Sequence, residues 1–348
     1  MLKNFTVSNF GSITDPVTLS LEPNEKVVRD ENETFLPVTM ILGSNCSGKS
    51  TLFDAMSLSQ ELASASTDIE VEAVLYSCED LFEDKPSSFE WEIEVEGKSY
   101  IYGFEVTKDT IVKEYLYAYE DEEYSMIFQR YKERYALARK SEGSYSKMTI
   151  NEDTLVLPSW ADWGDPICTE VANHIQNNFR FVNEYEFTHF FKFAYFSQNT
   201  QLLEDIKEVD LPIYWNDERK FYRQCWGAEG IEKFLALAVL VREVLQDGKT
   251  LIVDSLEDDL HPSLVQWILN KFTDAEENPK QAQLVFTTRT PWITQLVPLK
   301  QDQIVVTNQS RGERPMEVYR LSDFEPIPQG DFIKSYFEGR YDAIPRIV

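Results

Sequence analysis

The sequence has few of the residues that build metal sites and disulfide networks. Its 348 residues include 4 cysteines and 3 histidines, and no two cysteines form a Cys-x-x-Cys pair. This spacing argues against a zinc or redox site and indicates free thiols in a reducing, cytoplasmic environment. The cysteines are Cys46, Cys78, Cys168 and Cys225.

Long apolar runs are also missing. The longest, Phe234 to Val241, is far shorter than the ~20 residues that a bilayer-spanning helix needs. Met1 to Val7 alternate apolar and polar residues, which differs from the apolar block of a signal peptide. We therefore expect a cytoplasmic globular protein without membrane contact.

Basic residues are scarce relative to acidic ones. Lys and Arg total 33 against 60 Asp and Glu, which gives a formal net charge of −27. Such a charge repels nucleic-acid phosphates, so we expect the isolated chain not to bind duplex DNA, although it does not exclude a local basic groove. Two acidic runs, residues 79–84 and 120–123, are either solvated faces or a docking surface for a basic partner.

Hydrophobic residues, by contrast, are plentiful and regularly spaced. They make up 43% of the chain, and the length predicts about two domains, or one large domain with an insertion. Strict alternation in residues 1–21 and 86–119 predicts antiparallel strands. Four short continuous runs are typical of strands buried on both faces of a parallel sheet. They are residues 38–42, 250–254, 283–287 and 304–306.

Helical patterns alternate with these buried runs. Helices are predicted from about Ser50, over residues 231–244, and from Pro262, a residue favoured in the first helical turn. Residues 120–215 are mixed in pattern, and we predict them to be mostly helical. The alternation of strand and helix predicts an α/β fold with right-handed connections.

These patterns divide the chain into three predicted parts. Residues 1–119 would form the N-terminal part of the core with the antiparallel layer. Residues 120–225 would form an inserted helical lobe. Residues 226–348 would form the C-terminal part of the core, with the closing strands of the sheet.

One motif carries recognisable chemistry. Residues 43–50 match G-x-x-x-x-G-K-S, with a predicted strand before and a predicted helix after, as a phosphate loop requires. Backbone N–H groups and the helix N-terminus would bind the phosphates, Lys49 would reach the β- and γ-phosphates, and the Ser50 hydroxyl would ligate Mg²⁺. The predicted nucleotide-binding residues are Gly43, Ser44, Asn45, Cys46, Ser47, Gly48, Lys49, Ser50 and Thr51.

A second Mg²⁺ ligand is predicted at Asp254. This carboxylate follows the apolar run Thr250 to Val253, at the end of a predicted parallel strand. Ligands in open α/β sheets bind outside the carboxyl ends of the strands. Asp254 and Ser50 are therefore the predicted metal ligands.

Several segments resemble the ATP-binding-cassette/SMC-like head ATPases that occur as stand-alone proteins in bacterial defence and abortive-infection operons. They are LKNFTVSNFGSITDPVTLSL, LIVDSLEDDLHPSLVQWIL and KQDQIVVTNQS…YRLSDFEPI…SYFEGRYDAIP, together with the strand pair SSFEWEIEVEGKSYIYGFEV…IVKEYLYAY. The resemblance spans nearly the whole chain except residues 120–220. It implies a P-loop NTPase of the ABC/SMC-head type, a mixed sheet with an antiparallel layer and a helical lobe, and ATP bound between at least two copies.

The sequence departs from this family at positions used for hydrolysis. The residue after the Mg²⁺ aspartate is usually an acidic general base, and here it is Ser255. A neutral hydroxyl cannot act as that base, and loss of a general base costs roughly 10²–10⁴ in rate. Glu257 is an alternative base only if the end of the strand is shifted.

Two further positions differ. The strand at 283–287 would normally lead to a histidine near the γ-phosphate, and here Arg289 stands in that place; it can stabilise charge but cannot accept a proton. The signature loop resembles Ser-x-Gly, and here the counterpart is Ala228, Glu229 and Gly230. If Ala228 is aligned correctly, the serine that would reach the γ-phosphate across the dimer is missing.

Two functions follow from this resemblance. One is a nucleotide-dependent dimerisation switch that controls a partner effector in anti-phage defence, with slow or lost ATP hydrolysis. The other is an active ATPase motor on DNA, using Glu257 or Arg289 in a variant chemistry. A nuclease would need a further carboxylate cluster, and the sequence offers none that we can identify.

Overall fold

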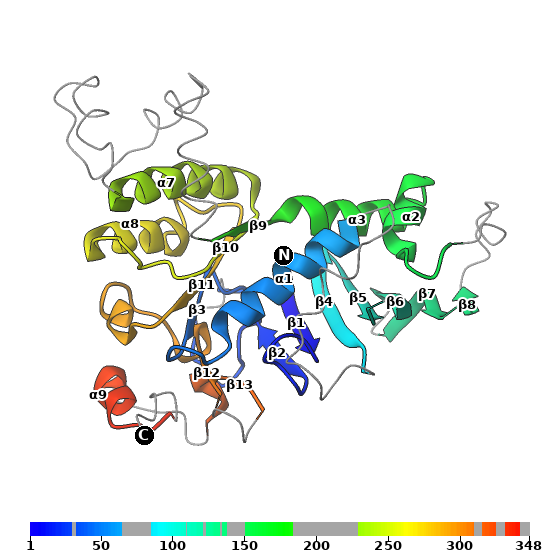
Figure 1. Cartoon of the computed structure of the whole chain (residues 1–348). Helices are drawn as coiled ribbons and strands as arrows, with labels where there is room; N and C mark the ends of the chain where they lie inside the picture. The colour runs from blue at the N-terminus through cyan, green and yellow to red at the C-terminus, as the bar shows by residue number, and fades with distance from the viewer. Residues whose placement is uncertain are drawn as a thin grey trace. The chain divides into compact units, whose positions relative to one another are not determined.

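The computed structural model of the chain describes residues 1–29, 33–64, 85–108, 110–120, 123–132, 134–137, 150–183, 229–309, 315–324 and 331–341. The chain folds into two compact units. Unit 1 contains residues 1–22, 46–179 and 307–318, and unit 2 contains residues 23–45, 180–306 and 319–348. Each unit is therefore assembled from segments that are far apart in the sequence (Figure 1).

Unit 1 contains an antiparallel sheet of seven strands in the order β2-β1-β4-β5-β6-β7-β8. The strands are β1 (Leu2–Ser8), β2 (Val17–Ser20), β4 (Ser87–Val95), β5 (Lys98–Val106), β6 (Ile111–Glu120), β7 (Glu123–Tyr131) and β8 (Arg134–Leu137). Along β4, buried and half-buried residues alternate strictly, which gives the sheet one buried and one partly exposed face.

Among its described residues, unit 1 contains three α-helices: α1 (Lys49–Ser64), α2 (Val156–Asp162) and α3 (Pro166–Asn178). The buried face of the sheet holds α1 through Trp91, whose Nε1 donates to Ser59 Oγ at 3.1 Å. The Gln60 amide donates to backbone carbonyls at the end of α3, including that of Ile175 at 2.8 Å. The helix that follows the predicted phosphate loop is thus anchored to both the sheet and α3.

The second sheet has six strands in the order β13-β12-β3-β11-β10-β9. They are β3 (Val38–Leu42), β9 (Phe179–Val182), β10 (Thr250–Val253), β11 (Gln283–Thr288), β12 (Ile304–Asn308) and β13 (Glu317–Arg320). β3 pairs in parallel with both β11 and β12, and β11 pairs in parallel with β10. All residues of β3, β10 and β11 are buried, as predicted for parallel strands covered on both faces.

Unit 2 also contains α7 (Glu229–Asp247), α8 (Pro262–Thr273), α9 (Phe332–Phe337) and three short 3₁₀ turns at Pro291–Gln295, Gln301–Gln303 and Leu321–Asp323. Its core joins β3, β10 and β11 to the apolar faces of α7 and α8. α8 begins after His261, whose ring accepts from the Ser263 N–H, with Pro262 in the first turn as predicted. The α/β class is confirmed, and so are all four predicted parallel strands.

The prediction that residues 120–215 are mostly helical is wrong for their first part. Residues 123–131 and 134–137 form β7 and β8, which extend the antiparallel sheet. β6 ends at Glu120, and β7 pairs antiparallel with it from Glu123 to Tyr131. Helices α2 and α3 follow, and residues 184–228 lie outside the described residues. The predicted part boundaries at 119 and 225 stay predictions.

No helix in the described ranges is long and apolar enough to span a membrane. Two of the four predicted free cysteines, Cys46 and Cys168, are free thiols. Cys78 and Cys225 fall in ranges that the structure does not describe.

Candidate functional site

The segment between β3 and α1 is the predicted phosphate loop. β3 ends at Leu42 and α1 begins at Lys49, so a loop joins a buried strand to a helix N-terminus. The Gly43 N–H donates to the Thr288 carbonyl at the end of β11, 3.2 Å away, which fixes where the loop leaves the sheet. The strand–loop–helix order that the motif requires is confirmed.

The conformation of this loop depends on glycine. Gly48 has a φ of 88°, and a Cβ built on it would lie 2.3 Å from the Met316 sulfur. Cys46 also has a positive φ, 63°, and its side chain is exposed. Ser47 is buried, with its Oγ 2.8 Å from Thr307 Oγ1. No other residue fits at position 48 without displacing Met316 or straining the backbone.

The polar groups of the loop are arranged to receive an anion. Within the described part of the chain, the backbone N–H groups of residues 45–48 have no hydrogen-bond acceptor. Lys49 is only 7% exposed, and its Nζ lies 3.5 Å from Ser47 Oγ. Unpaired N–H groups at a helix N-terminus beside a lysine ammonium suit the oxygens of a phosphate chain.

Asp254 is the first residue after β10. Because β3, β11 and β10 run parallel, Asp254 lies at the same carboxyl edge of the sheet as Gly43. The Thr287 hydroxyl donates to Asp254 Oδ1 at 2.5 Å and accepts from the Ser255 N–H at 2.8 Å. The carboxylate that we predicted as a metal ligand is therefore held in place by the neighbouring strand, and its oxygens suit Mg²⁺.

The turn after Asp254 is held by α7. Ser255 has a φ of 53°, which is uncommon for a residue other than glycine. The ammonium of Lys233, a residue 8% exposed, donates to the carbonyls of Ser255 and Asp258, each at 2.9 Å. A Cβ on Gly230 would lie 2.1 Å from the Asp259 carbonyl oxygen. The first turn of α7 therefore packs directly on the turn at 254–259.

Glu257 and Arg289 both have partners within unit 2. Glu257 Oε1 accepts from the Arg289 N–H at 2.9 Å and from Thr290 Oγ1 at 3.1 Å. Its Oε2 is buried and has no partner among the described residues. The Arg289 guanidinium lies 2.5 Å from both oxygens of Asp258, and hydrogen bonding to that carboxylate raises the Arg289 pKa. Strand β10 ends where predicted, so the shift that a Glu257 base required is absent.

The sheet edge thus brings together Asp254, Ser255, Glu257 and Arg289. Of the predicted signature loop, Ala228 lies outside the described residues, while Glu229 begins α7 and Gly230 lies in its first turn.

Sequence reasoning missed three residues that organise this edge. Thr287 supports Asp254, Asp258 pairs with Arg289, and Lys233 holds the turn. Lys233 had a detectable signal, since it is the single cation in the stretch 231–241, whose other residues are apolar except Glu232. Thr287 and Asp258 carried no such signal, because threonine at a strand end and aspartate in a turn are common.

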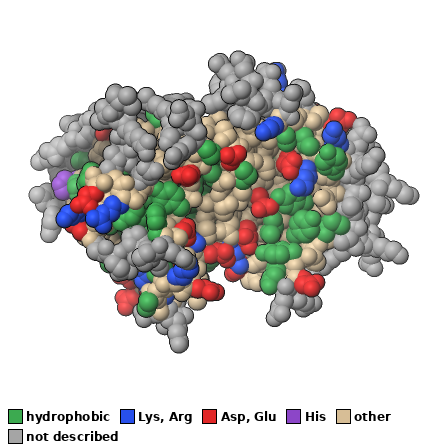
Figure 2. Space-filling view, turned by 90° about the horizontal axis from the view of Figure 1, so that it is seen from below, with side chains coloured by type: hydrophobic (Ala, Val, Ile, Leu, Met, Phe, Trp, Pro, Cys, Tyr) green, Lys and Arg blue, Asp and Glu red, His purple; other side chains and the backbone are tan. Residues whose placement is uncertain are grey.

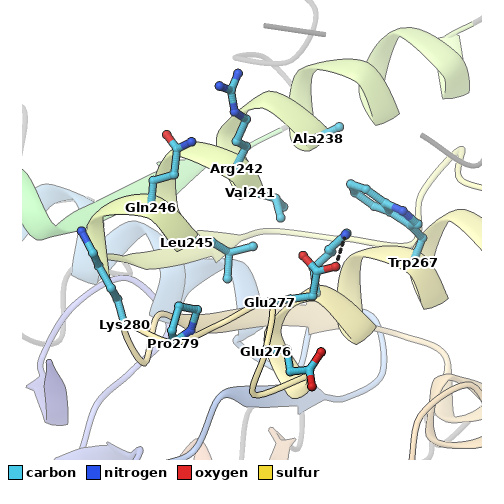
Figure 3. A pocket seen from close by; sticks show the side chains of 11 residues that line it. Ala238, Val241, Arg242, Leu245, Gln246, Trp267, Glu276, Glu277, Pro279 and Lys280 are labelled. Atoms are coloured by element: carbon cyan, nitrogen blue, oxygen red, sulfur yellow. Dashed lines mark ion pairs between the residues drawn. The ribbon is translucent and has the colours of Figure 1, made fainter. Parts of the chain in front are cut away.

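A groove of about 540 Å³ lies elsewhere in unit 2, between α7, α8 and the segment after α8. Val241 and Leu245 point into it and Trp267 lies at one side, while Lys271 and Glu277 form an ion pair of 2.8 Å across it (Figure 3). None of its lining residues belongs to the phosphate loop or to the turn at 254–259. The groove is therefore not the predicted nucleotide site.

The family comparison agrees with the phosphate-loop interpretation. Residues 38–141 match the family described as "AAA domain, putative AbiEii toxin, Type IV TA system". No curated protein matches the chain. A solved structure described as "SMC head domain from Thermotoga maritima" is similar at 14% identity and a TM-score of 0.44, covering 92% of this chain and 98% of that chain. A likeness this distant carries no conclusion about activity.

The family match begins at β3 and includes the loop, α1 and most of the antiparallel sheet. It covers less than half of the chain. Together with the parallel strands around β3 and the glycine-dependent loop, it supports a nucleotide-binding P-loop fold.

Proposed function

We propose that the chain binds ATP with Mg²⁺ through residues 43–51 and Asp254. The observation that carries the proposal is the loop itself, whose N–H groups at 45–48 lack acceptors among the described residues and lie beside buried Lys49. The Ser50 hydroxyl and the Asp254 carboxylate would hold Mg²⁺, which when bound neutralises charge on the β- and γ-phosphates. That these two residues share one ion is inferred from the sequence motif.

We further propose that hydrolysis is slow or lost. Ser255 occupies the position of the general base, and its hydroxyl cannot accept a proton at neutral pH. Glu257 Oε1 is engaged by Arg289 N–H and Thr290, and the Arg289 side chain is paired with Asp258. Glu257 Oε1 and the Arg289 side chain are thus engaged in contacts of the protein itself. A variant chemistry that uses Glu257 or Arg289 is the alternative.

The biological role that we propose is a switch in the cytoplasm. ATP binding would drive association of two or more copies and thereby control a partner effector in anti-phage defence. The family description, which names a toxin of a TA system, supports a defence context. The net charge of −27 favours a protein partner over nucleic acid.

The first test is nucleotide binding, measured by titration calorimetry with ATP and Mg²⁺. Lys49→Ala removes the ammonium that would bind the β- and γ-phosphates, and we expect affinity to fall by at least about 100-fold, or about 2.7 kcal/mol. Lys98→Ala is the control, because Lys98 is exposed in the hairpin between β4 and β5. A Lys49→Ala protein that binds ATP as tightly as the wild type would show that the loop is not the nucleotide site.

A second measurement tests the switch against the motor. Native mass of the wild-type chain, with and without ATP, should show association only with ATP. A mobility-shift titration with duplex DNA at about 0.15 M salt should show no submicromolar binding. On the face in Figure 2, Lys and Arg side chains are scattered among Asp and Glu and form no continuous basic track in the described region. Tight DNA binding with DNA-stimulated hydrolysis would instead favour the motor.

A further inference from the structure

The second face of the seven-stranded sheet in unit 1 has a distinctive composition. Its cross-strand rows run through Glu90, Gly103 and Tyr115, and through Glu92, Ile101 and Tyr117. Apart from the buried Gly103, the residues on this face are half-buried or exposed, whereas their neighbours along each strand are buried in the core with Trp91 and Tyr102. On the side of Figure 2 where β4 to β8 lie, hydrophobic-coloured side chains, a class that includes tyrosine, gather beside acidic ones.

We call this surface the tyrosine–glutamate face and define it by Glu90, Glu92, Glu105, Tyr115, Tyr117 and Tyr119. The three tyrosines stand at alternate positions of β6, so all three point to the same side of the sheet. Tyr115 and Tyr117 have ring centroids 5.7 Å apart, and Tyr119 lies 4.9 Å from Tyr124 of β7. The rings therefore form two contacting pairs on this face, one along β6 and one between β6 and β7.

The row is held in place by the carboxylates. A Cβ on Gly103 would lie 2.4 Å from the Tyr115 ring, so the missing side chain lets the ring lie flat across β5. The Tyr115 hydroxyl then donates to Glu90 Oε2 at 2.5 Å, two strands away. The Tyr124 hydroxyl likewise donates to Glu92 Oε1 at 3.0 Å. Burial, followed by this hydrogen bond, raises the Tyr124 pKa to about 12.

The negative charge of Glu90 and Glu92 is not neutralised by this network. Their donors are tyrosine hydroxyls and the Asn4 amide, which is neutral and lies 2.7 Å from Glu92 Oε2. No Lys or Arg of the described residues forms an ion pair with either carboxylate. The Asn4 amide also donates to Glu22 at 3.1 Å, which adds a third carboxylate beside the first two.

One cation of the chain already shows how this face receives positive charge. The Lys113 ammonium lies 4.8 Å from the centre of the Tyr115 ring and 3.4 Å from Glu105 Oε1. An aromatic ring and a carboxylate together bind a cation by cation–π and Coulomb attraction. Tyr117 and Glu92 lie in the next cross-strand row, with Ile101 of β5 between them.

We propose that the tyrosine–glutamate face is a docking surface for a basic polypeptide segment, whose Lys or Arg side chains would lie between the tyrosine rings and the carboxylates of Glu90 and Glu92. A second copy of this chain is a poor occupant, because it also carries a net charge of −27. DNA is excluded by the same carboxylates. The surface is independent of the phosphate loop, so this proposal goes beyond nucleotide binding and does not rest on it.

The experiment uses the full chain and a short fluorescein-labelled peptide in which Lys and Arg alternate with Gly, read by fluorescence anisotropy at about 0.15 M salt. We expect Glu90→Gln/Glu92→Gln to weaken binding by about tenfold and Tyr117→Ala by a few-fold. Glu276→Gln/Glu277→Gln is the matched control, because it changes the net charge equally in unit 2 and should leave binding within about twofold. Thermal melts of each variant check that it is folded.

The outcomes separate the proposal from its alternatives. A peptide with Gln in place of Lys and Arg should not bind, and Lys49→Ala should bind the basic peptide like the wild type. Equal weakening by the two double substitutions would show that the peptide responds only to net charge, and the proposal would then be wrong. Loss of peptide binding in Lys49→Ala would contradict its independence from the loop, whereas unchanged ATP binding by the Glu90→Gln/Glu92→Gln protein would confirm it.

Discussion

The phosphate loop and the turn at 254–259 are both short connections after parallel strands, yet they differ in how many of their polar groups are hydrogen-bonded within the protein. In the loop, the N–H groups of residues 45–48 have no acceptor within the described residues. In the turn, the carbonyls of Ser255 and Asp258 receive the Lys233 ammonium, and the Asp258 carboxylate receives Arg289. One segment is open to an external ligand, and the other is occupied by the protein's own side chains.

The difference has a functional meaning within our proposal. Binding phosphate requires donors that are free before the ligand arrives, whereas hydrolysis requires a base that can reach water and accept a proton. The loop meets the first requirement, because the N–H groups of residues 45–48 are free, within the described part of the chain, before the ligand binds. The turn, with Ser255 at the base position and Glu257 Oε1 already engaged, does not meet the second. A protein built in this way would hold ATP for long periods, which suits a switch.

The largest expected effect comes from restoring the base. Ser255→Glu should raise the ATP turnover rate by up to ~10² if the added carboxylate reaches the attacking water. Turnover is measured as phosphate release under saturating ATP. Ser255→Gln is the matched control and should leave the rate unchanged, because the glutamine amide is similar in size to the glutamate carboxylate but cannot accept a proton.

The ATP turnover rate of the wild-type protein tests the proposal that hydrolysis is slow or lost. A rate of ~1 s⁻¹ or faster lies within the usual enzyme range and would contradict the proposal of lost hydrolysis. Glu257→Gln would then be the next substitution to measure.

The second effect concerns the pH dependence of stability in unit 1. Glu114 is fully buried on β6 and accepts from the N–H groups of Val156 and Leu157 at the start of α2. Burial raises its pKa from 4.5 to about 7. Because the folded state keeps this proton more tightly than the unfolded state, stability should fall as pH rises from 4.5 to about 7 and change no further above that.

Glu114→Gln should remove this dependence. We expect the difference in unfolding free energy between wild type and variant to change by about 1.4 kcal/mol per pH unit within that interval. Urea denaturation at a series of pH values measures it, with Glu105→Gln as a partly exposed control on the next strand. An unchanged slope in Glu114→Gln would contradict the assignment. Either result leaves the turn at 254–259 untouched and so tests unit 1 separately.

A smaller effect is expected from releasing the turn. Lys233→Met keeps the apolar stem and removes the ammonium that donates to two carbonyls, so stability should fall by about 1–3 kcal/mol. Amide exchange at residues 254–259 should rise, because the turn loses its anchor to α7. Lys280→Met is the control, because Lys280 is exposed. Unaltered exchange in Lys233→Met would show that the carbonyl contacts do not hold the turn.

The smallest effect is expected from Asp258→Asn. The pair with Arg289 is largely solvent-accessible, with the arginine side chain 45% exposed, so stability should change by less than about 1 kcal/mol. If Arg289 contacts the γ-phosphate, its release from Asp258 should improve the preference for ATP over ADP by a few-fold. Competition binding with both nucleotides measures this, and an unchanged ratio would remove Arg289 from the site.

Much of this architecture was predictable because the signals were local. The runs at 38–42 and 250–253 are apolar apart from one threonine each, and the loop motif fixes its own strand and helix, so β3, β10 and α1 were placed nearly to the residue. The return of the chain through β7 was not predictable. Its sequence EYSMIFQRY lacks strict alternation, because a register shift near Tyr117 interrupts the pairing with β6.

The site was predicted in its residues but not in its contacts. Asp254, Ser255 and Arg289 follow recognisable strands, so they could be placed at one sheet edge from sequence alone. The contacts of Arg289 with Asp258 and of Lys233 with the turn depend on side-chain directions and on the packing of α7. Such contacts between residues 22 to 31 positions apart leave no periodic pattern in the sequence.

The phosphate loop contains an exposed thiol that can be modified chemically. Cys46 is exposed in the middle of the loop, at a backbone angle that turns it away from the core, whereas Cys168 is buried and its pKa is raised by burial. A maleimide should therefore alkylate Cys46 far faster than Cys168. Because a phosphate chain bound at the loop would cover this thiol, the alkylation rate of Cys46 itself, followed by peptide mass analysis, would report occupancy without labelled nucleotide. The same exposure makes Cys46 prone to oxidation during storage. A sulfenic or sulfinic group at Cys46 would place negative charge where an anion should bind.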